Sequence, residues 1–128
     1  MIVGSGIDIV EVERVEGVLR RRGKRFRERV FTERERLDCD RRLNPAPHFA
    51  LRFAAKEAGM KAVGTGWRRG VGWRDFEVIE GPHGLEIQLS GRALHFARER
   101  GGDRVWIAAS TQRTHAVAEV VLERTSAA

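Results

Sequence analysis

The sequence of 128 residues has one cysteine, no low-complexity tract and no long hydrophobic run. Because Cys39 has no partner within the chain, an internal disulfide is excluded and a reducing compartment is expected. The first 15 residues lack the basic start of a signal peptide, and Asp8 interrupts their apolar stretch. No later segment reaches the roughly 20 apolar residues of a membrane-spanning helix. We therefore expect a soluble cytoplasmic protein with no membrane anchor.

Internal repeats and linker-like segments are also missing from the chain. A chain of this length buries roughly two-thirds of the surface that its unfolded form exposes, so its hydrophobic core needs no disulfide or structural metal to be stable. We therefore expect a single domain over residues 1–128.

The net charge is +6, and the sequence pI is about 10.8, so we expect an anionic partner. Much of this charge is local, because seven basic residues between Arg20 and Arg29 are opposed only by Glu28. Nucleic acid, an acidic protein and a phosphorylated small molecule all agree with the charge. A helix face that only meets solvent explains the run equally well.

The pattern of apolar, glycine and capping residues predicts an α+β domain with a mainly antiparallel sheet. Thr32 and Glu35 form a capping-box pattern, and Gly64 ends the strongest helix. The expected strands are 2–10, 73–80, 85–89, 105–110 and 116–123. The expected helices begin near residue 12, run from 32 to about 42, and cover 48–63 and 91–100.

Asp8 is an acid within the apolar first strand. The two-residue period of a strand places Gly4, Gly6 and Asp8 on one face, and we expect the two glycines to leave open space beside the acid. Burial of an acid is costly unless it is paired, hydrogen-bonded or bound to a metal. Backbone donors or an arginine could satisfy Asp8, and so could a metal ion.

The helix predicted at 48–63 carries Phe49, Phe53, Glu57 and Lys61 at steps of four, so these residues share one stripe. The two aromatic residues indicate that the first half of the stripe faces the core, so we expect Glu57 to lie near the edge of the core. One interpretation is an exposed Glu57–Lys61 ion pair. The other is a second metal carboxylate with a phosphate-binding lysine one turn on. Two carboxylates with open coordination positions suit Mg²⁺, which keeps waters and binds substrate phosphates.

Four segments together resemble the holo-acyl-carrier-protein synthases. These segments are GIDIVEVERV at 6–15, RFAAKEAGMKAVGTG at 52–66, GWRDFEVIEGPHG at 72–84 and AVAEVVLE at 116–123. They follow the order and the separations of that family, and they span nearly the whole chain. The resemblance implies a 4′-phosphopantetheinyl transferase-like fold in which the sheet packs with a long helix. It also implies a homotrimer, because this chain supplies one of the two halves that longer relatives fuse.

The implied activity is the Mg²⁺-dependent transfer of 4′-phosphopantetheine from coenzyme A to a serine of an apo acyl carrier protein. Asp8 and Glu57 match the positions that hold Mg²⁺, or Mn²⁺ in its place, against the coenzyme pyrophosphate. Lys61 matches a lysine that contacts phosphate oxygens. Other positions that the resemblance places along the coenzyme site are Arg52, Lys56, Gly64, Thr65, Gly66 and Thr111.

The resemblance also locates the docking surface for the acidic carrier protein. Arg14 matches an arginine that meets an acidic carrier side chain near the serine. The carrier's acidic helix would dock on the basic run, which includes Arg20, Arg21 and Arg25.

Two positions depart from the family pattern. Met60 stands where a small polar residue is common, and Thr111 stands where the strand motif usually has a histidine. Thr111 cannot act as a base near neutral pH as imidazole can. We expect His115 to belong to the next strand rather than to replace that histidine. We expect Trp67, Trp73 and Trp106 to be packing residues.

Two other functions are alternatives to this enzyme. A basic nucleic-acid-binding module explains the charge but leaves the paired acids unexplained, and the chain has no ribonucleoprotein, zinc or KH motif. An inactive relative that binds a carrier or coenzyme A is suggested by Thr111. We expect an enzyme that binds neither nucleic acid nor membrane.

Overall fold

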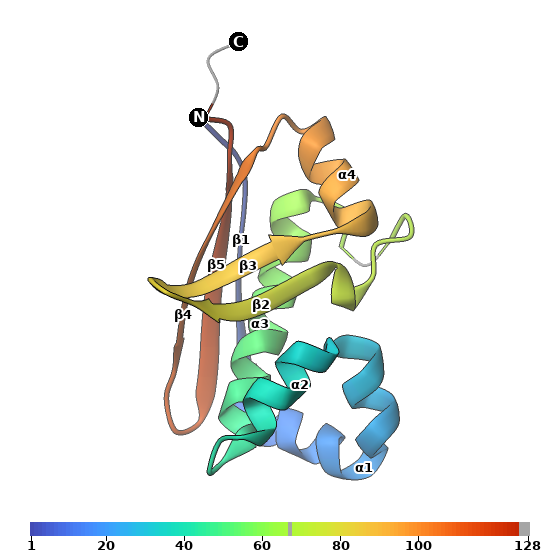
Figure 1. Ribbon diagram of the computed structural model, residues 1–128, viewed down its shortest axis with the longest axis vertical. Helices are drawn as coiled ribbons and strands as arrows, with labels where there is room; N and C mark the ends of the chain where they lie inside the picture. The colour runs from blue at the N-terminus through green and yellow to red at the C-terminus, as the bar shows by residue number, and fades with distance from the viewer. Residues whose placement is uncertain (67, 126–128) are drawn as a thin grey trace.

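The computed structural model describes residues 1–66 and 68–125. Within these ranges, strands and helices form an α+β fold in which every strand pair is antiparallel, as predicted (Figure 1). No helix in these ranges has the length and apolar composition needed to cross a bilayer. The elements in chain order are β1 (Ile2–Glu11), α1 (Val12–Val30), α2 (Glu33–Asp40), α3 (Pro45–Val63), the 3-10 helix η1 (Trp73–Asp75), β2 (Phe76–Gly81), β3 (Gly84–Leu89), α4 (Gly91–Glu99), β4 (Arg104–Thr111) and β5 (His115–Glu123).

The strands form a three-stranded sheet of order β1-β5-β4 and a separate β2-β3 hairpin. The sheet lies along one side of α3, and the hairpin crosses α3 in the view of Figure 1. Helix α3 is alanine-rich, and most of its residues are buried. One hydrophobic cluster joins its second half to β2, β5 and α4, and another joins its first half to α1 and α2. The helix is therefore the element that fixes the other elements in space.

The glycines of β1 have a different role from the one predicted. A Cβ atom on Gly4 would lie 2.1 Å from the Ala62 carbonyl oxygen, and one on Gly6 would lie 2.2 Å from the Ala58 carbonyl oxygen. Atoms cannot approach so closely, so only glycine lets the strand backbone lie directly against α3. The expectation that these two glycines leave open space is wrong, because the helix fills the space next to Gly4 and Gly6.

The caps of two helices agree with the sequence prediction. Thr32 and Glu35 form both hydrogen bonds of a capping box at the start of α2. Gly64, with a φ angle of 86°, ends α3 in the left-handed conformation. Helix α3 begins at Pro45, three residues before the predicted start, because proline is well tolerated in the first turn.

Helix α1 carries the basic run and bends within it. Gly23 has φ 44° and ψ −122°, which are non-helical values. Beyond the bend, the Arg27 side chain forms a paired contact with the Asp40 carboxylate and lies over the Phe49 ring. Arg27 therefore joins α1 to α2, whereas Arg20, Arg21 and Arg25 are exposed.

The tryptophans differ from one another in their surroundings. The Trp73 ring stacks on Phe53 with a centroid distance of 5.0 Å, so the packing prediction is confirmed there. Trp106 is 48% exposed, and its indole N–H donates to the Glu123 carboxylate at 2.9 Å. The packing prediction is therefore wrong for Trp106 within this chain. Trp67 lies outside the described residues.

The outer face of the three-stranded sheet carries exposed apolar side chains. Ile7 and Ile9 of β1 are 59% and 63% exposed, and Trp106 of β4 also lies on exposed surface. Asp8 lies between the two isoleucines and points the other way, toward α3. Strand β1 thus has an apolar outer face and an inner face against the helix.

Candidate active site

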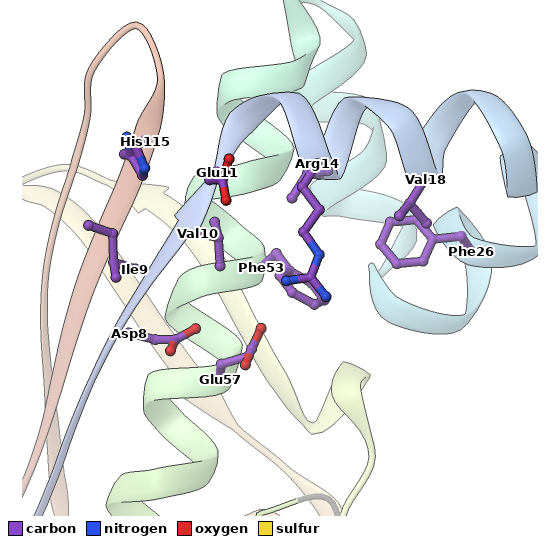
Figure 2. Close-up of a pocket in the computed structure, with 11 residues that line it drawn as sticks. Asp8, Ile9, Val10, Glu11, Arg14, Val18, Phe26, Phe53, Glu57 and His115 are labelled. Carbon is purple, nitrogen blue, oxygen red and sulfur yellow. The ribbon is translucent and has the colours of Figure 1, made fainter.

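A cavity of about 490 Å³ lies where the end of β1, the start of α1 and the middle of α3 meet. Both predicted metal-binding acids line it (Figure 2). The complete lining is Asp8, Ile9, Val10, Glu11, Arg14, Val15, Val18, Phe26, Phe53, Glu57 and His115.

Asp8 and Lys61 form an ion pair at the edge of this cavity. The Lys61 Nζ donates to the Asp8 Oδ1 at 3.0 Å and to the Ile7 carbonyl oxygen at 3.0 Å. The Asp8 side chain is 16% exposed, whereas the lysine is 54% exposed. Asp8 therefore has a lysine partner rather than the backbone donors or arginine that were considered. The alternative of a simple Glu57–Lys61 pair does not match this geometry.

Glu57 extends from α3 toward Asp8, and Figure 2 shows the two carboxyl groups facing each other. Burial, the negative charge of Asp8 and a hydrogen bond with Asp8 raise the pKa of Glu57 to about 7. Lys61 and Arg14 act in the opposite direction. Near neutral pH the negative charges of Asp8 and Glu57 therefore repel each other. Binding of either a proton or a cation relieves this repulsion.

The chemistry of this pair fits a hydrated divalent cation. Among residues 1–66 and 68–125, no cluster of three or more His, Cys, Asp or Glu side chains is arranged to hold a metal. Two carboxylates leave most of a coordination shell open. Mg²⁺ suits such a site, because it keeps several waters and completes its shell with substrate phosphate oxygens. Burial and the neighbouring Asp8 outweigh the opposite effects of Lys61 and Arg14 on the pKa of Glu57.

Arg14 lies where the acidic and apolar parts of the cavity meet. Figure 2 shows its guanidinium group extending into the cavity from α1, near Phe53. It lies close enough to Glu57 to lower the pKa of that acid. The apolar part beyond it is formed by Val15, Val18, Phe26 and Phe53.

Two basic residues of α3 do not reach the cavity. The Lys56 side chain has 0% exposure and donates to the Glu35 carboxylate at 2.7 Å. Arg52 is 1% exposed, and its NH1 group donates to the His48 carbonyl oxygen at 3.3 Å. We correct the prediction that these side chains contact the coenzyme, because a side chain buried to this extent presents no surface to it.

The remaining predicted positions lie apart from the two acids. Gly64, Thr65 and Gly66 follow the end of α3, beyond Lys61. Thr111 lies on β4 and is separated from β1 by β5, and it is not part of the cavity lining. Arg20, Arg21 and Arg25 extend the charge of Arg14 along the exposed surface of α1.

His115 is a cavity residue that the sequence reasoning did not select. It begins β5, as predicted, and pairs with Glu11 across the strands. Its Nδ1 atom lies 2.8 Å from the Thr114 hydroxyl oxygen. No local sequence signal identifies it, because only the long-range register between β1 and β5 places the start of β5 beside the end of β1.

Comparisons with known proteins agree with this site. The family model described as the 4′-phosphopantetheinyl transferase superfamily matches residues 4–118. The holo-(acyl-carrier-protein) synthase of Koribacter versatilis is 47% identical over 96% of this chain and 99% of that protein. The protein of the same name from Solibacter usitatus is 41% identical over the same shares of the two chains.

Solved structures give the same result. A holo-(acyl-carrier-protein) synthase from Neisseria meningitidis has a TM-score of 0.87 and 35% identity, covering 96% of this chain and 99% of that chain. The Bacillus anthracis enzyme, solved in complex with CoA (3′,5′-ADP), has a TM-score of 0.80 and 38% identity, with coverage of 98% and 99%. This chain therefore belongs to the 4′-phosphopantetheinyl transferase superfamily, within the group of holo-(acyl-carrier-protein) synthases.

Proposed function

We propose that this protein transfers 4′-phosphopantetheine from coenzyme A to a serine of an apo acyl carrier protein. The observation that carries the proposal is the meeting of Asp8 from β1 and Glu57 from α3 in one cavity, with Lys61 bonded to Asp8. Relatives named as synthases of this kind support the choice of substrates. The single, buried Cys39 agrees with the cytoplasmic location that we propose.

In the proposed reaction, the serine hydroxyl attacks the β-phosphorus of coenzyme A. A new bond forms between phosphorus and the serine oxygen, the pyrophosphate bond breaks, and adenosine 3′,5′-bisphosphate leaves. Transfer of this type depends mainly on positioning and charge neutralisation. Mg²⁺, when bound, supplies a Lewis acid that polarises the phosphate oxygens.

Four side chains at the cavity have separate roles in this proposal. Asp8 and Glu57 would hold the cation. Lys61 would turn from Asp8 toward the phosphate oxygens once a cation neutralises that acid, because its side chain is half-exposed. Arg14 would orient the acidic side chain that accompanies the carrier serine.

The activity can be tested by intact-mass analysis of apo acyl carrier protein after incubation with the enzyme, coenzyme A and Mg²⁺. We expect the carrier to gain the mass of one phosphopantetheine group. If several carriers gain no mass and the protein binds nucleic acid tightly, the proposal is wrong. Binding of coenzyme A without any transfer would identify an inactive relative.

The first prediction concerns docking of the carrier on α1. Reversing the charge of Arg20, Arg21 and Arg25 should raise the carrier KM several-fold and leave the coenzyme KM nearly unchanged. Reversing the charge of Arg14 should raise the carrier KM more than it raises the coenzyme KM. Exposed charge acts mainly on the association rate, so the effect should shrink as salt is added. Steady-state kinetics at low and high salt measure this effect. An unchanged carrier KM at low salt would show that docking occurs elsewhere.

The second prediction concerns Thr111. Because this residue lies outside the cavity of its own chain, Thr111→Ala should lower kcat by no more than a few-fold. Thr111→His should be tolerated. A near-complete loss of turnover in the alanine variant, with normal folding by circular dichroism, would show that Thr111 has an essential part in the reaction.

We also propose that the protein is a homotrimer with an active site at each subunit interface. The exposed Ile7, Ile9 and Trp106 side chains on the outer face of the sheet support self-association, since exposed apolar patches commonly mark contact surfaces. The third prediction is a light-scattering mass of three times the 14.5 kDa chain at micromolar concentration. A monomer that retains full activity at that concentration would contradict the trimer.

A further inference from the structure

Lys56, which the resemblance placed beside the coenzyme, belongs instead to a buried network behind the cavity. Its Nζ donates to the Glu35 carboxylate at 2.7 Å, to the Phe76 carbonyl oxygen at 2.6 Å and to the Trp73 carbonyl oxygen at 3.2 Å. An ammonium group has three N–H donors, so each of them has an acceptor. Burial lowers the pKa of the lysine, and the Glu35 carboxylate offsets part of that effect.

Glu35 completes the network from the other side. Its Oε1 accepts from the Thr32 backbone N–H at 2.8 Å, and its Oε2 accepts from the Val78 backbone N–H at 3.0 Å. Both Glu35 and Lys56 are fully buried. One ion pair therefore ties together α2, α3, the turn at η1 and the start of β2.

The network reaches the cavity through Trp73. The backbone of Trp73 is held by Lys56, and its ring stacks on Phe53 at 5.0 Å with an interplanar angle of 19°. Phe53 lines the cavity one helical turn before Glu57, and its other neighbour is Phe26 of α1, at 6.1 Å between ring centroids. Phe53 and Phe26 form an aromatic wall of the cavity, and Trp73 packs behind Phe53. This wall lies beside α1, the helix on which the carrier is proposed to dock.

We propose that the Glu35–Lys56 ion pair is a positioning device that sets the aromatic wall of the active site. The pair holds the turn at Trp73 in one place, and the Trp73 ring holds Phe53 in the orientation that shapes the apolar part of the cavity. The inference rests on the proposed function only for what that wall contacts, namely the incoming carrier and the phosphopantetheine arm.

A purely stabilising role is a poor explanation for this pair. Two buried charges are costly to desolvate, and apolar residues of similar volume often stabilise a fold as well or better. The ion pair also depends on geometry, because its hydrogen bonds hold α3 against the Trp73 and Phe76 carbonyl oxygens and hold α2 against the Val78 backbone N–H. Among the described residues, the buried side-chain atoms without a hydrogen-bond partner belong to Arg52, and neither Lys56 nor Glu35 is among them.

The test uses Lys56→Met and Glu35→Gln in the full-length enzyme labelled with 5-fluorotryptophan. The chain has three tryptophans, and loss of one ¹⁹F resonance in Trp73→Leu identifies the signal of that ring. We expect the Trp73 resonance to shift or broaden in both variants. The carrier KM should rise roughly tenfold while the coenzyme KM stays within about twofold, since modest misplacement of a positioning group costs up to about 10²-fold. Trp73→Leu should reproduce the rise in carrier KM with the ion pair intact.

Arg42→Met is the matched control. Arg42 forms an exposed ion pair with Glu80, near the end of β2 that is opposite to Trp73. This variant should leave the Trp73 resonance and both KM values unchanged. Lower melting temperatures in Lys56→Met and Glu35→Gln, with an unchanged Trp73 resonance and carrier KM, would overturn the inference. If Lys56→Met does not fold, the milder variant Glu35→Gln provides the test of the positioning role. If the wild-type enzyme modifies no carrier, the proposed function fails, and the resonance still tests the positioning.

Discussion

Asp8→Asn and Glu57→Gln should each lower kcat/KM by at least about 10²-fold, because each removes a carboxylate that would hold the proposed cation, and that cation would offset the negative charge that develops on the phosphate. The substitutions preserve the size of the side chains, so each variant should fold normally. The double variant should lose little more than either single variant, since both acids serve one ion. Asp8→Asn should also lower the pKa of Glu57, because a negative neighbour is removed.

Carrier modification at a series of Mg²⁺ concentrations measures this prediction, with thermal melting as the check on folding. Glu13→Gln is the control, because Glu13 is an exposed acid in the first turn of α1 outside the cavity lining. Full activity in either acid variant would remove the metal site from the proposal. A structure of the coenzyme complex in which the two carboxyl groups lie more than about 6–7 Å apart would also remove the metal site from the proposal. One Mg²⁺ with ligand distances of about 2.1 Å could not bind both carboxyl groups at that separation.

Gly6→Ala should be both unstable and inactive, although it adds only a methyl group. The new Cβ would lie 2.2 Å from the Ala58 carbonyl oxygen and 2.7 Å from the Lys61 Cβ. The nearest atom belongs to the backbone of α3 and cannot turn aside, so the strand and the helix must separate. Overpacking of this kind costs about 1–3 kcal/mol or more. Asp8 lies two residues further along the same face, so the separation also moves it away from Glu57.

Thermal melting should show a decrease of about 5–10 °C for Gly6→Ala, and transfer activity should fall further than the loss of folded protein explains. Gly72→Ala is the matched control, because its φ is −110° and, apart from its chain neighbours, the nearest atom to a new Cβ is the Asp75 Oδ1, 4.0 Å away. A Gly6→Ala protein with wild-type stability would mean that β1 and α3 lie further apart than described.

Much of the fold could be predicted because its signals are local. The capping box at Thr32 and Glu35, the glycine that ends α3 and the hairpin turn before β3 each lie within a few residues. The stripe of α3 likewise placed Glu57 at the edge of the core. Local pattern also suggested that Asp8 and Glu57 meet, but only together with the family resemblance.

The errors arose where distant segments come together. A glycine looks the same in sequence whether it leaves space open or allows a helix to approach, so Gly6 was misread. Lys56 and Arg52 lie on the side of α3 that faces α2 and β2, and the packing of those elements is not visible in the helical stripe. His115 was passed over because its place in the cavity depends on the register between β1 and β5.

If the protein assembles through the outer face of β1 as proposed, the two faces of this strand would link protein concentration to catalysis. Ile7 and Ile9 point outward to the surface proposed for self-association, and Asp8 between them points inward to the cavity. Neighbouring residues of one strand share a backbone, so movement of the strand at its outer face also moves the side chains on its inner face. In an enzyme assembled through this face, dilution below the dissociation constant would free β1 at its outer surface and shift Asp8. Activity per milligram would then depend on how far the stock is diluted before the assay begins.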